Sequence, residues 1–127
     1  MLPRCDRMWP DVYWRSERYV AMEVDSPEQM DLAFDTRDGS AMGLVGPTVF
    51  AVGADDRYIV VKQHPAKDAA SAGDRSRTNY FYIERTNSPD FRERQRRVIG
   101  PLTEEEFRER ATALKLPSFQ KVFRDLQ

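Results

Sequence analysis

Reactive side chains are scarce in this chain of 127 residues. It contains one cysteine, Cys5, and one histidine, His64. A single cysteine cannot form an intramolecular disulfide, which excludes the bridge-stapled small domains typical of secreted proteins. One cysteine and one histidine also cannot complete a Cys/His zinc cluster. We therefore expect no metal ion and no other cofactor.

Long apolar runs and catalytic fingerprints are missing as well. No stretch approaches the roughly 18 apolar residues of a membrane span, and the first ten residues are too charged for the apolar region of a signal peptide. We expect a cytoplasmic protein as the sequence is written, and a periplasmic or lipid-anchored one if a leader has been removed. The glycine-rich, metalloprotease and serine-hydrolase motifs are absent, so we expect no enzyme.

Charge of one sign is also not in excess. The formal net charge is -1, whereas whole-domain attraction to nucleic acid needs a basic excess or a basic face. The length fits one domain, and 40% hydrophobic residues suffice for a core. We expect a single domain over residues 1–127: an aromatic-rich segment at 1–18, an antiparallel sheet at 19–99 and helices at 103–126.

Alternation of apolar and polar residues predicts several strands. Met30, Leu32 and Phe34 share one face of the clearest of them, with the period of two of a half-buried strand. Residues 64–78 have no periodicity and predict a long mobile loop. The predicted fold class is α+β: a single meander-like antiparallel sheet of about five to six strands, packed by one or two C-terminal helices. The expected strands are 19–25, 30–35, 45–52, 57–63, 79–84 and 98–99.

The strongest local signal is the start of a helix in GPLTEEEF. Thr103 and Glu106 have the spacing of a capping box, in which each residue bonds the backbone N–H of the other. The helix should end before Pro117, because proline cannot continue it. A second short helix is predicted over 119–126 from apolar residues at helical spacing.

The basic run FRERQRR is the main charge feature, and we expect it in a loop. Guanidinium groups suit phosphates or the carboxylates of an acidic protein. Trp9 and Trp14 lie with Tyr13 before the first predicted strand; exposed aromatics could anchor a partner, whereas buried ones would belong to the core. The candidate binding residues are Trp9, Trp14, Arg92, Arg94, Arg96 and Arg97.

Other polar residues have weaker signals. His64 precedes a proline at the start of the predicted loop, where a solvated, idle imidazole is the simplest interpretation. Asp31 and Asp35 share a face of one strand and, with Asp38, could hold a hard cation. A hydrolase that depends on two converging carboxylates is therefore a third hypothesis.

Over roughly residues 45–117, the chain resembles a family of small bacterial proteins classed as a domain of unknown function. The resemblance rests on AVGADDRYIVVKQ, NYFYIER and VIGPLTEEEFRERATALKLP, which are strand, turn and helix-cap sequences. Many members are exported or lipid-anchored. The resemblance implies a fold and supplies no catalytic residues.

These features together favour binding over catalysis. We expect a non-enzymatic protein-binding module of the inhibitor or toxin-immunity kind, whose partner is another protein such as a toxin or an enzyme. The alternative is a nucleic-acid or phosphate binder through the arginine-rich loop, with Arg75, Arg77 and Arg85 contributing. Nucleic acid is the less expected of the two partners, given the overall charge.

Overall fold

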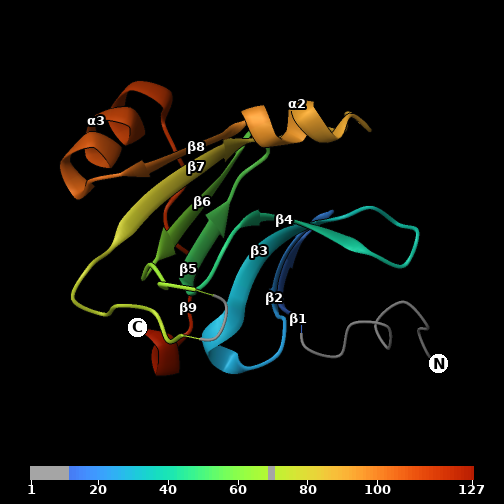
Figure 1. Cartoon of the computed structure of the whole chain (residues 1–127). Coiled ribbons are helices and arrows are strands. Elements are labelled where there is room, and N and C mark those ends of the chain that lie inside the picture. Colours follow the sequence, from blue (N-terminus) through green and yellow to red (C-terminus); the bar gives the residue numbers. More distant parts are fainter. Residues whose placement is uncertain (1–11, 69–70) are drawn as a thin grey trace.

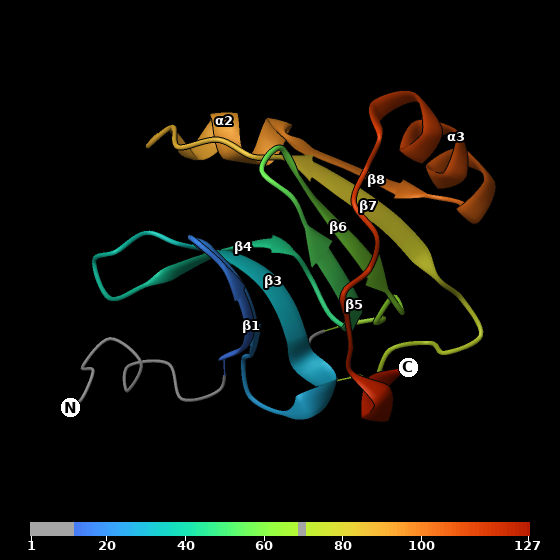
Figure 2. The same cartoon turned by 180° about the vertical axis from the view of Figure 1, so that it is seen from behind.

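The computed structural model describes residues 12–68 and 71–127, which form two antiparallel sheets and few helices (Figures 1 and 2). The first sheet has the order β1-β2-β3-β4 and the second β8-β7-β6-β5-β9. The fold is mostly β. The strands are β1 (Val12–Ser16), β2 (Tyr19–Glu23), β3 (Met30–Asp35), β4 (Ala41–Val45), β5 (Val49–Ala54), β6 (Tyr58–Gln63), β7 (Asn79–Glu84), β8 (Val98–Leu102) and β9 (Lys121–Val122). The helices are α2 (Phe91–Arg96) and α3 (Glu104–Leu114), with single turns η1 (Pro27–Gln29) and η2 (Arg124–Leu126).

The prediction of an α+β fold with one sheet of five to six strands is wrong. The alternation of apolar and polar residues indicates which side chains of a strand share a face, but it does not indicate which strands pair with one another. The chain changes sheets between β4 and β5, at Gly46 and Pro47. Proline has no N–H to donate to a ladder, so it suits a break between sheets. Both sheets then bury an apolar face against the other.

The main core lies between the two sheets. Leu32 and Phe34 of β3 face it from the first sheet, and Val52, Ile59 and Val61 face it from the second. All five side chains are completely buried. Burial of one such side chain contributes about 1.5–3 kcal/mol relative to exposure, so this interface is the main source of stability.

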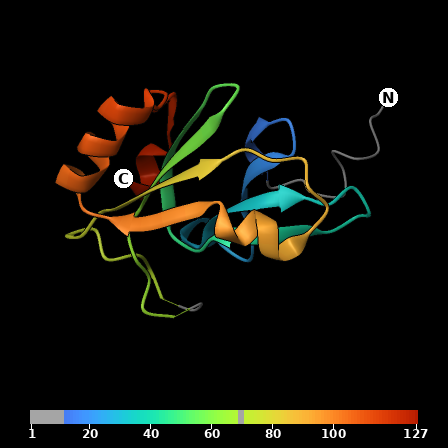
Figure 3. The ribbon, with the colours of Figure 1, turned by 90° about the horizontal axis from the view of Figure 1, so that it is seen from above.

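The second sheet is also covered on its other face, by α3. Tyr58, Val60 and Tyr82 point to that side and pack against Phe107 of the helix. The predicted capping box is confirmed: the Glu106 N–H donates to Thr103 Oγ1 at 3.1 Å, and the Thr103 N–H donates to Glu106 Oε1 at 2.8 Å. Figure 3 shows α2 and α3 at opposite ends of β8. The second sheet is therefore the middle layer.

Four local predictions also differ from the structure. Residues 12–16 form β1, within the segment expected to precede the sheet, and 41–45 form β4, which was not predicted. The arginine-rich segment is helix α2 and not a loop. The predicted second C-terminal helix, 119–126, is replaced by β9 and η2, because Val122 and Lys121 pair with β5. An unpaired edge of β5 outweighs the helical spacing of that segment.

Candidate functional site

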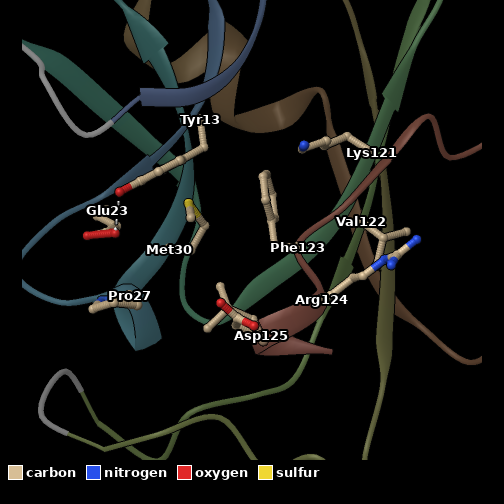
Figure 4. A pocket seen from close by; sticks show the side chains of 10 residues that line it. Tyr13, Glu23, Pro27, Met30, Lys121, Val122, Phe123, Arg124 and Asp125 are labelled. Carbon is tan, nitrogen blue, oxygen red and sulfur yellow. Dashed lines mark hydrogen bonds between the residues drawn. The ribbon is translucent and has the colours of Figure 1, made fainter.

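A groove opens between the two sheets, where the end of the chain passes the first strands (Figure 4). Its volume is about 630 Å³, within the range of roughly 300–1,000 Å³ typical of ligand sites. One wall comes from β1, β2 and the start of β3, and the other comes from β9 and η2. The lining residues are Tyr13, Glu23, Pro27, Met30 and residues 121–126.

The floor of the groove is apolar and continuous with the main core. Met30 and Leu126 are buried, and Phe123 packs partly buried against the same cluster. Met30 faces inward because it alternates along β3 with the inward-facing Leu32 and Phe34. The Leu126 N–H donates to the Phe123 carbonyl at 2.9 Å, which closes the η2 turn and brings Leu126 into the core. Shape and apolarity here are thus fixed by the fold.

The rim of the groove exposes large apolar side chains on opposite walls. Tyr13 is 48% exposed and Val122 is 37% exposed. The Tyr13 hydroxyl donates to Glu23 Oε1 at 2.7 Å, and Figure 4 shows both residues across the groove from Lys121 and Phe123. Aromatic side chains with a polar tip are common anchors of protein interfaces.

Charges of both signs surround this apolar floor. Glu23 lies on one wall, whereas Lys121, Arg124 and Asp125 lie on the other. A charged rim around an apolar centre is an arrangement common in protein–protein interfaces.

Arg75 holds the C-terminal wall in place. Its guanidinium donates to the Asp125 carbonyl at 2.9 Å and forms an ion pair with Glu28 at 2.9 Å. This contact ties η2 to η1, which precedes β3. The two walls of the groove are therefore linked by a side chain from outside it.

Two strand edges border the groove. β1 is at one end of its sheet and β9 is at one end of the other. β9 pairs with β5 alone, through Ala51 with Val122 and Val52 with Lys121. An edge strand presents backbone donors and acceptors to any chain that can lie beside it. The groove can therefore offer both main-chain hydrogen bonds and apolar contacts.

The arginine-rich segment lies elsewhere, on α2, and three of its four arginines are engaged within the chain. Arg94 is buried, and its guanidinium donates to the Ser88 carbonyl at 3.0 Å. Arg96 and Arg97 both pair with Glu93, at 2.7 and 2.6 Å. Within the described residues, the Arg92 side chain has no charged partner. The structure therefore does not gather the four guanidinium groups on one free surface.

Trp14 is also separate from the arginines of α2. Trp14 lies on β1 and packs half-buried against the main core. Trp9 lies outside the described residues. Tyr13, which directly precedes Trp14, is exposed and lines the groove.

His64 is buried and not solvated as expected. Its ring stacks on Phe50 with centroids 4.0 Å apart and planes 10° from parallel. Nδ1 is 2.7 Å from the Arg77 carbonyl, which accepts a hydrogen bond when that nitrogen carries the proton. Nε2 is buried with no hydrogen-bond partner. The contacts of this imidazole are those of a core residue.

The carboxylates considered for cation binding do not meet. Asp35 pairs with Arg15 at 3.3 Å, and Asp38 accepts hydrogen bonds from Thr36 and Ser40 in its own turn. Hydrogen bonds from these two hydroxyls lower the pKa of Asp38 to about 2. Across residues 12–68 and 71–127, no three His, Cys, Asp or Glu side chains form a group that could hold a metal ion.

The third of these carboxylates, Asp31, does not contact Asp35 or Asp38. It faces a small pocket on the outer side of the first sheet, and its Oδ1 atom is buried without a hydrogen-bond partner. Burial raises the pKa of this carboxyl to about 6. Gly43 leaves open space beside the carboxylate, since a Cβ there would stand 3.9 Å from Asp31 Oδ2.

Comparison with known proteins places this scaffold in a family. A family model described as a protein of unknown function (DUF3997) matches residues 17–125. The chain belongs to this family. The match covers both sheets except β1, together with α3 and most of the C-terminal wall of the groove. No curated protein and no solved structure matches the chain.

The groove was missed in the sequence because its two walls come from opposite ends of the chain. The apolar residues of the C-terminal wall also have helical spacing, and this spacing led to the wrong prediction of a helix there.

The match to the DUF3997 model confirms the resemblance to a family of unknown function. In the part of the chain that the structure describes, no helix has the length and apolarity to cross a membrane.

Proposed function

We propose that this member of DUF3997 is a non-enzymatic bacterial protein-binding module of the inhibitor or toxin-immunity kind. It receives an extended segment of its partner in the groove between β1 and β9. The observation that carries the proposal is the combination of an apolar floor with two strand edges that have no further strand beside them among the described residues. Recognition of peptides by strand addition uses these two features together.

Each part of the groove has a role in this mode of binding. The free edge of β1 or β9 supplies main-chain hydrogen bonds, which hold any extended chain regardless of sequence. Alternate side chains of the segment then point toward Met30 and Phe123, so apolar residues at every second position are preferred. Glu23 and Lys121 lie on opposite walls of the groove, and their charges would select the orientation of a segment with charged flanks.

Affinity would come mainly from surface that is still exposed in the free chain. Tyr13 and Val122 retain 48% and 37% of their exposure, and covering them removes apolar area from water at about 25 cal/mol per Å². The hydrogen bond between Tyr13 and Glu23 at the rim is itself exposed to solvent. Binding therefore needs little rearrangement of the sheets.

Selection of peptides from a random displayed library tests the proposal. The selected sequences should show apolar residues at alternate positions, and Val122→Glu should weaken their binding at least about tenfold, since 1.4 kcal/mol corresponds to that factor. The matched control is Val24→Glu, because Val24 is also an exposed valine, at 54%, and lies outside the groove.

Two outcomes would overturn this mode of binding. One is a library that yields no binder with alternating apolar residues. The other is a set of binders whose affinity falls equally with Val122→Glu and Val24→Glu, because such a result would mean that the peptides do not bind specifically in the groove.

The nucleic-acid alternative has less support from the contacts. Arg94, Arg96 and Arg97 are engaged within the chain, and Arg75 and Arg85 are held by Glu28 and Glu17. Binding to phosphates would have to break these contacts. Retention on heparin at low salt with a steep loss on added salt would favour the alternative.

A further inference from the structure

A second, polar pocket lies at the other end of β2 from the groove. Its volume is about 240 Å³, and it is formed where turns of both sheets meet. The β1–β2 turn, the β3–β4 turn, the β5–β6 turn and the segment after β7 each contribute. The lining residues that matter are Glu17, Arg18, Arg37, Asp56, Arg85 and Asn87.

Arg18 is held in place with its hydrogen-bonding fork unused. Its Nε donates to the Asp35 carbonyl at 2.9 Å, and its guanidinium carbon lies 4.6 Å from the centre of the Phe34 ring. The two terminal nitrogens have no acceptor within the described residues. A guanidinium that is already oriented loses little entropy when it binds an anion through both nitrogens.

Arg85 supplies charge, and both of its terminal nitrogens are already engaged in hydrogen bonds. Its guanidinium donates to the Ser16 hydroxyl at 2.7 Å and to the Asp55 carbonyl at 2.9 Å, and it pairs with Glu17 at 2.7 Å. These bonds use its fork to join the β1–β2 turn to the β5–β6 turn. Arg85 therefore forms a fixed wall of the pocket.

Arg37 brings the third guanidinium into the pocket. It has a φ of 65° in the β3–β4 turn, a conformation uncommon for residues other than glycine. Its exposed side chain has no charged partner among the described residues. Arg37 can therefore turn toward a ligand at small cost.

The balance of charge limits what the pocket can hold. Three guanidinium groups face two carboxylates, those of Glu17 and Asp56, which leaves a formal charge of +1. A ligand with one negative charge would neutralise this net charge. A polyphosphate carries more negative charge than the pocket can neutralise, and the two carboxylates would repel it. The Asn87 amide lines the same pocket and adds a neutral donor.

We propose that this pocket binds a singly charged oxyanion of the carboxylate type, with Arg18 as the bidentate donor and Arg37 as the second cation. The pocket and the groove share no lining residue. Oxyanion binding can therefore be tested independently of peptide binding in the groove.

Titration of the full chain with acetate, followed by amide and guanidinium NMR signals, tests the proposal at constant ionic strength. Acetate should shift the signals of Arg18, Tyr19 and Asn87 along a saturable curve, whereas chloride should leave them in place. Arg18→Gln should weaken acetate binding about tenfold, as expected for loss of a bidentate charged contact. Arg37→Gln should weaken it less, and because Arg37 is exposed this variant keeps the fold intact.

Arg92→Gln is the matched control, since it removes an exposed arginine of α2 outside the pocket. Acetate binding should be unchanged in that variant. Equal shifts at all exposed arginines, or unchanged affinity in both Arg18→Gln and Arg37→Gln, would overturn the site. Tighter binding of sulfate than of acetate would overturn the preference for a single charge.

Discussion

Aromatic rings reach the margin of the sheet interface in two regions, and they are buried at one margin and partly exposed at the other. Near α2, the guanidinium carbons of Arg18 and Arg94 each lie 4.6 Å from the centre of the Phe34 ring. At the groove, Phe123 is only partly buried and Tyr13 is largely exposed. Cations over aromatic faces stabilise the first margin from within the chain. At the second margin, part of the apolar surface of Phe123 and Tyr13 stays exposed, and the proposed partner would cover it.

The contacts of Arg94 differ from those expected for the basic run. In sequence, the basic run looked like a surface for a partner, yet Arg94 is used to close the chain's own core. The side chains of Tyr13 and Val122, in contrast, are 48% and 37% exposed at the groove rim. Residues that cover the core should therefore affect stability, and residues of the groove should affect binding.

Replacement of Phe34 should give the largest effect and the sharpest contrast. Phe34→Ala removes a completely buried ring and the surface on which two guanidinium groups lie, and we expect a loss of about 3–5 kcal/mol in the free energy of unfolding. Phe123→Ala should cost about 1–2 kcal/mol, because that ring is only partly buried. Urea denaturation measures both. Equal losses of unfolding free energy in Phe34→Ala and Phe123→Ala would contradict the difference between the two margins.

Loss of the Arg94 side chain should have the next largest effect. Arg94→Ala removes the contact with Phe34 and the hydrogen bond to the Ser88 carbonyl, which together are worth about 2 kcal/mol. Arg92→Ala, on the exposed side of the same helix, should change the free energy of unfolding by less than about 0.5 kcal/mol. If the two variants unfold at the same urea concentration, α2 does not close the core through Arg94.

Asp31 is a partly buried carboxyl that has no ion pair and no ring contact with the other described residues. Burial raises its pKa from 3.8 to about 6, so the folded state holds the proton more tightly than the unfolded state. This stabilisation is present below about pH 4 and is lost as the pH rises through 6. We expect a change on the order of 1 kcal/mol, because water still reaches part of the carboxyl and screens it.

The check for Asp31 is the difference in free energy of unfolding between the natural chain and Asp31→Asn, measured from pH 4 to pH 7. The natural chain should lose stability relative to the variant as the pH rises. A difference that stays constant over this range would mean that the carboxyl titrates normally.

The smallest effect on stability is expected at the groove rim. Val122→Glu and Val24→Glu should each change the free energy of unfolding by less than about 0.5 kcal/mol, since both valines are exposed. Thermal unfolding of the two variants measures this. A large loss in Val122→Glu would mean that Val122 holds β9 on β5, so its effect on peptide binding would be indirect.

The elements with strong local signals were predictable from sequence. β3 and β7 have the predicted bounds, and the capping box of Thr103 and Glu106 forms as expected. The separation into two sheets was not predictable, because strand pairing depends on contacts distant in sequence. The groove needs the C-terminal segment to lie on β5, and helical spacing at Phe119 and Val122 concealed that outcome.

The order in which the strands are synthesised has a consequence for β9. β5 leaves the ribosome long before β9, the strand that pairs with its outer edge. Until then, a nascent chain exposes the edge of a strand in which residues 49–53 will be buried, and exposed apolar edges favour pairing with other chains. Translation that stalls before residue 117 should therefore release an aggregation-prone product, and a chaperone that shields β5 would protect it.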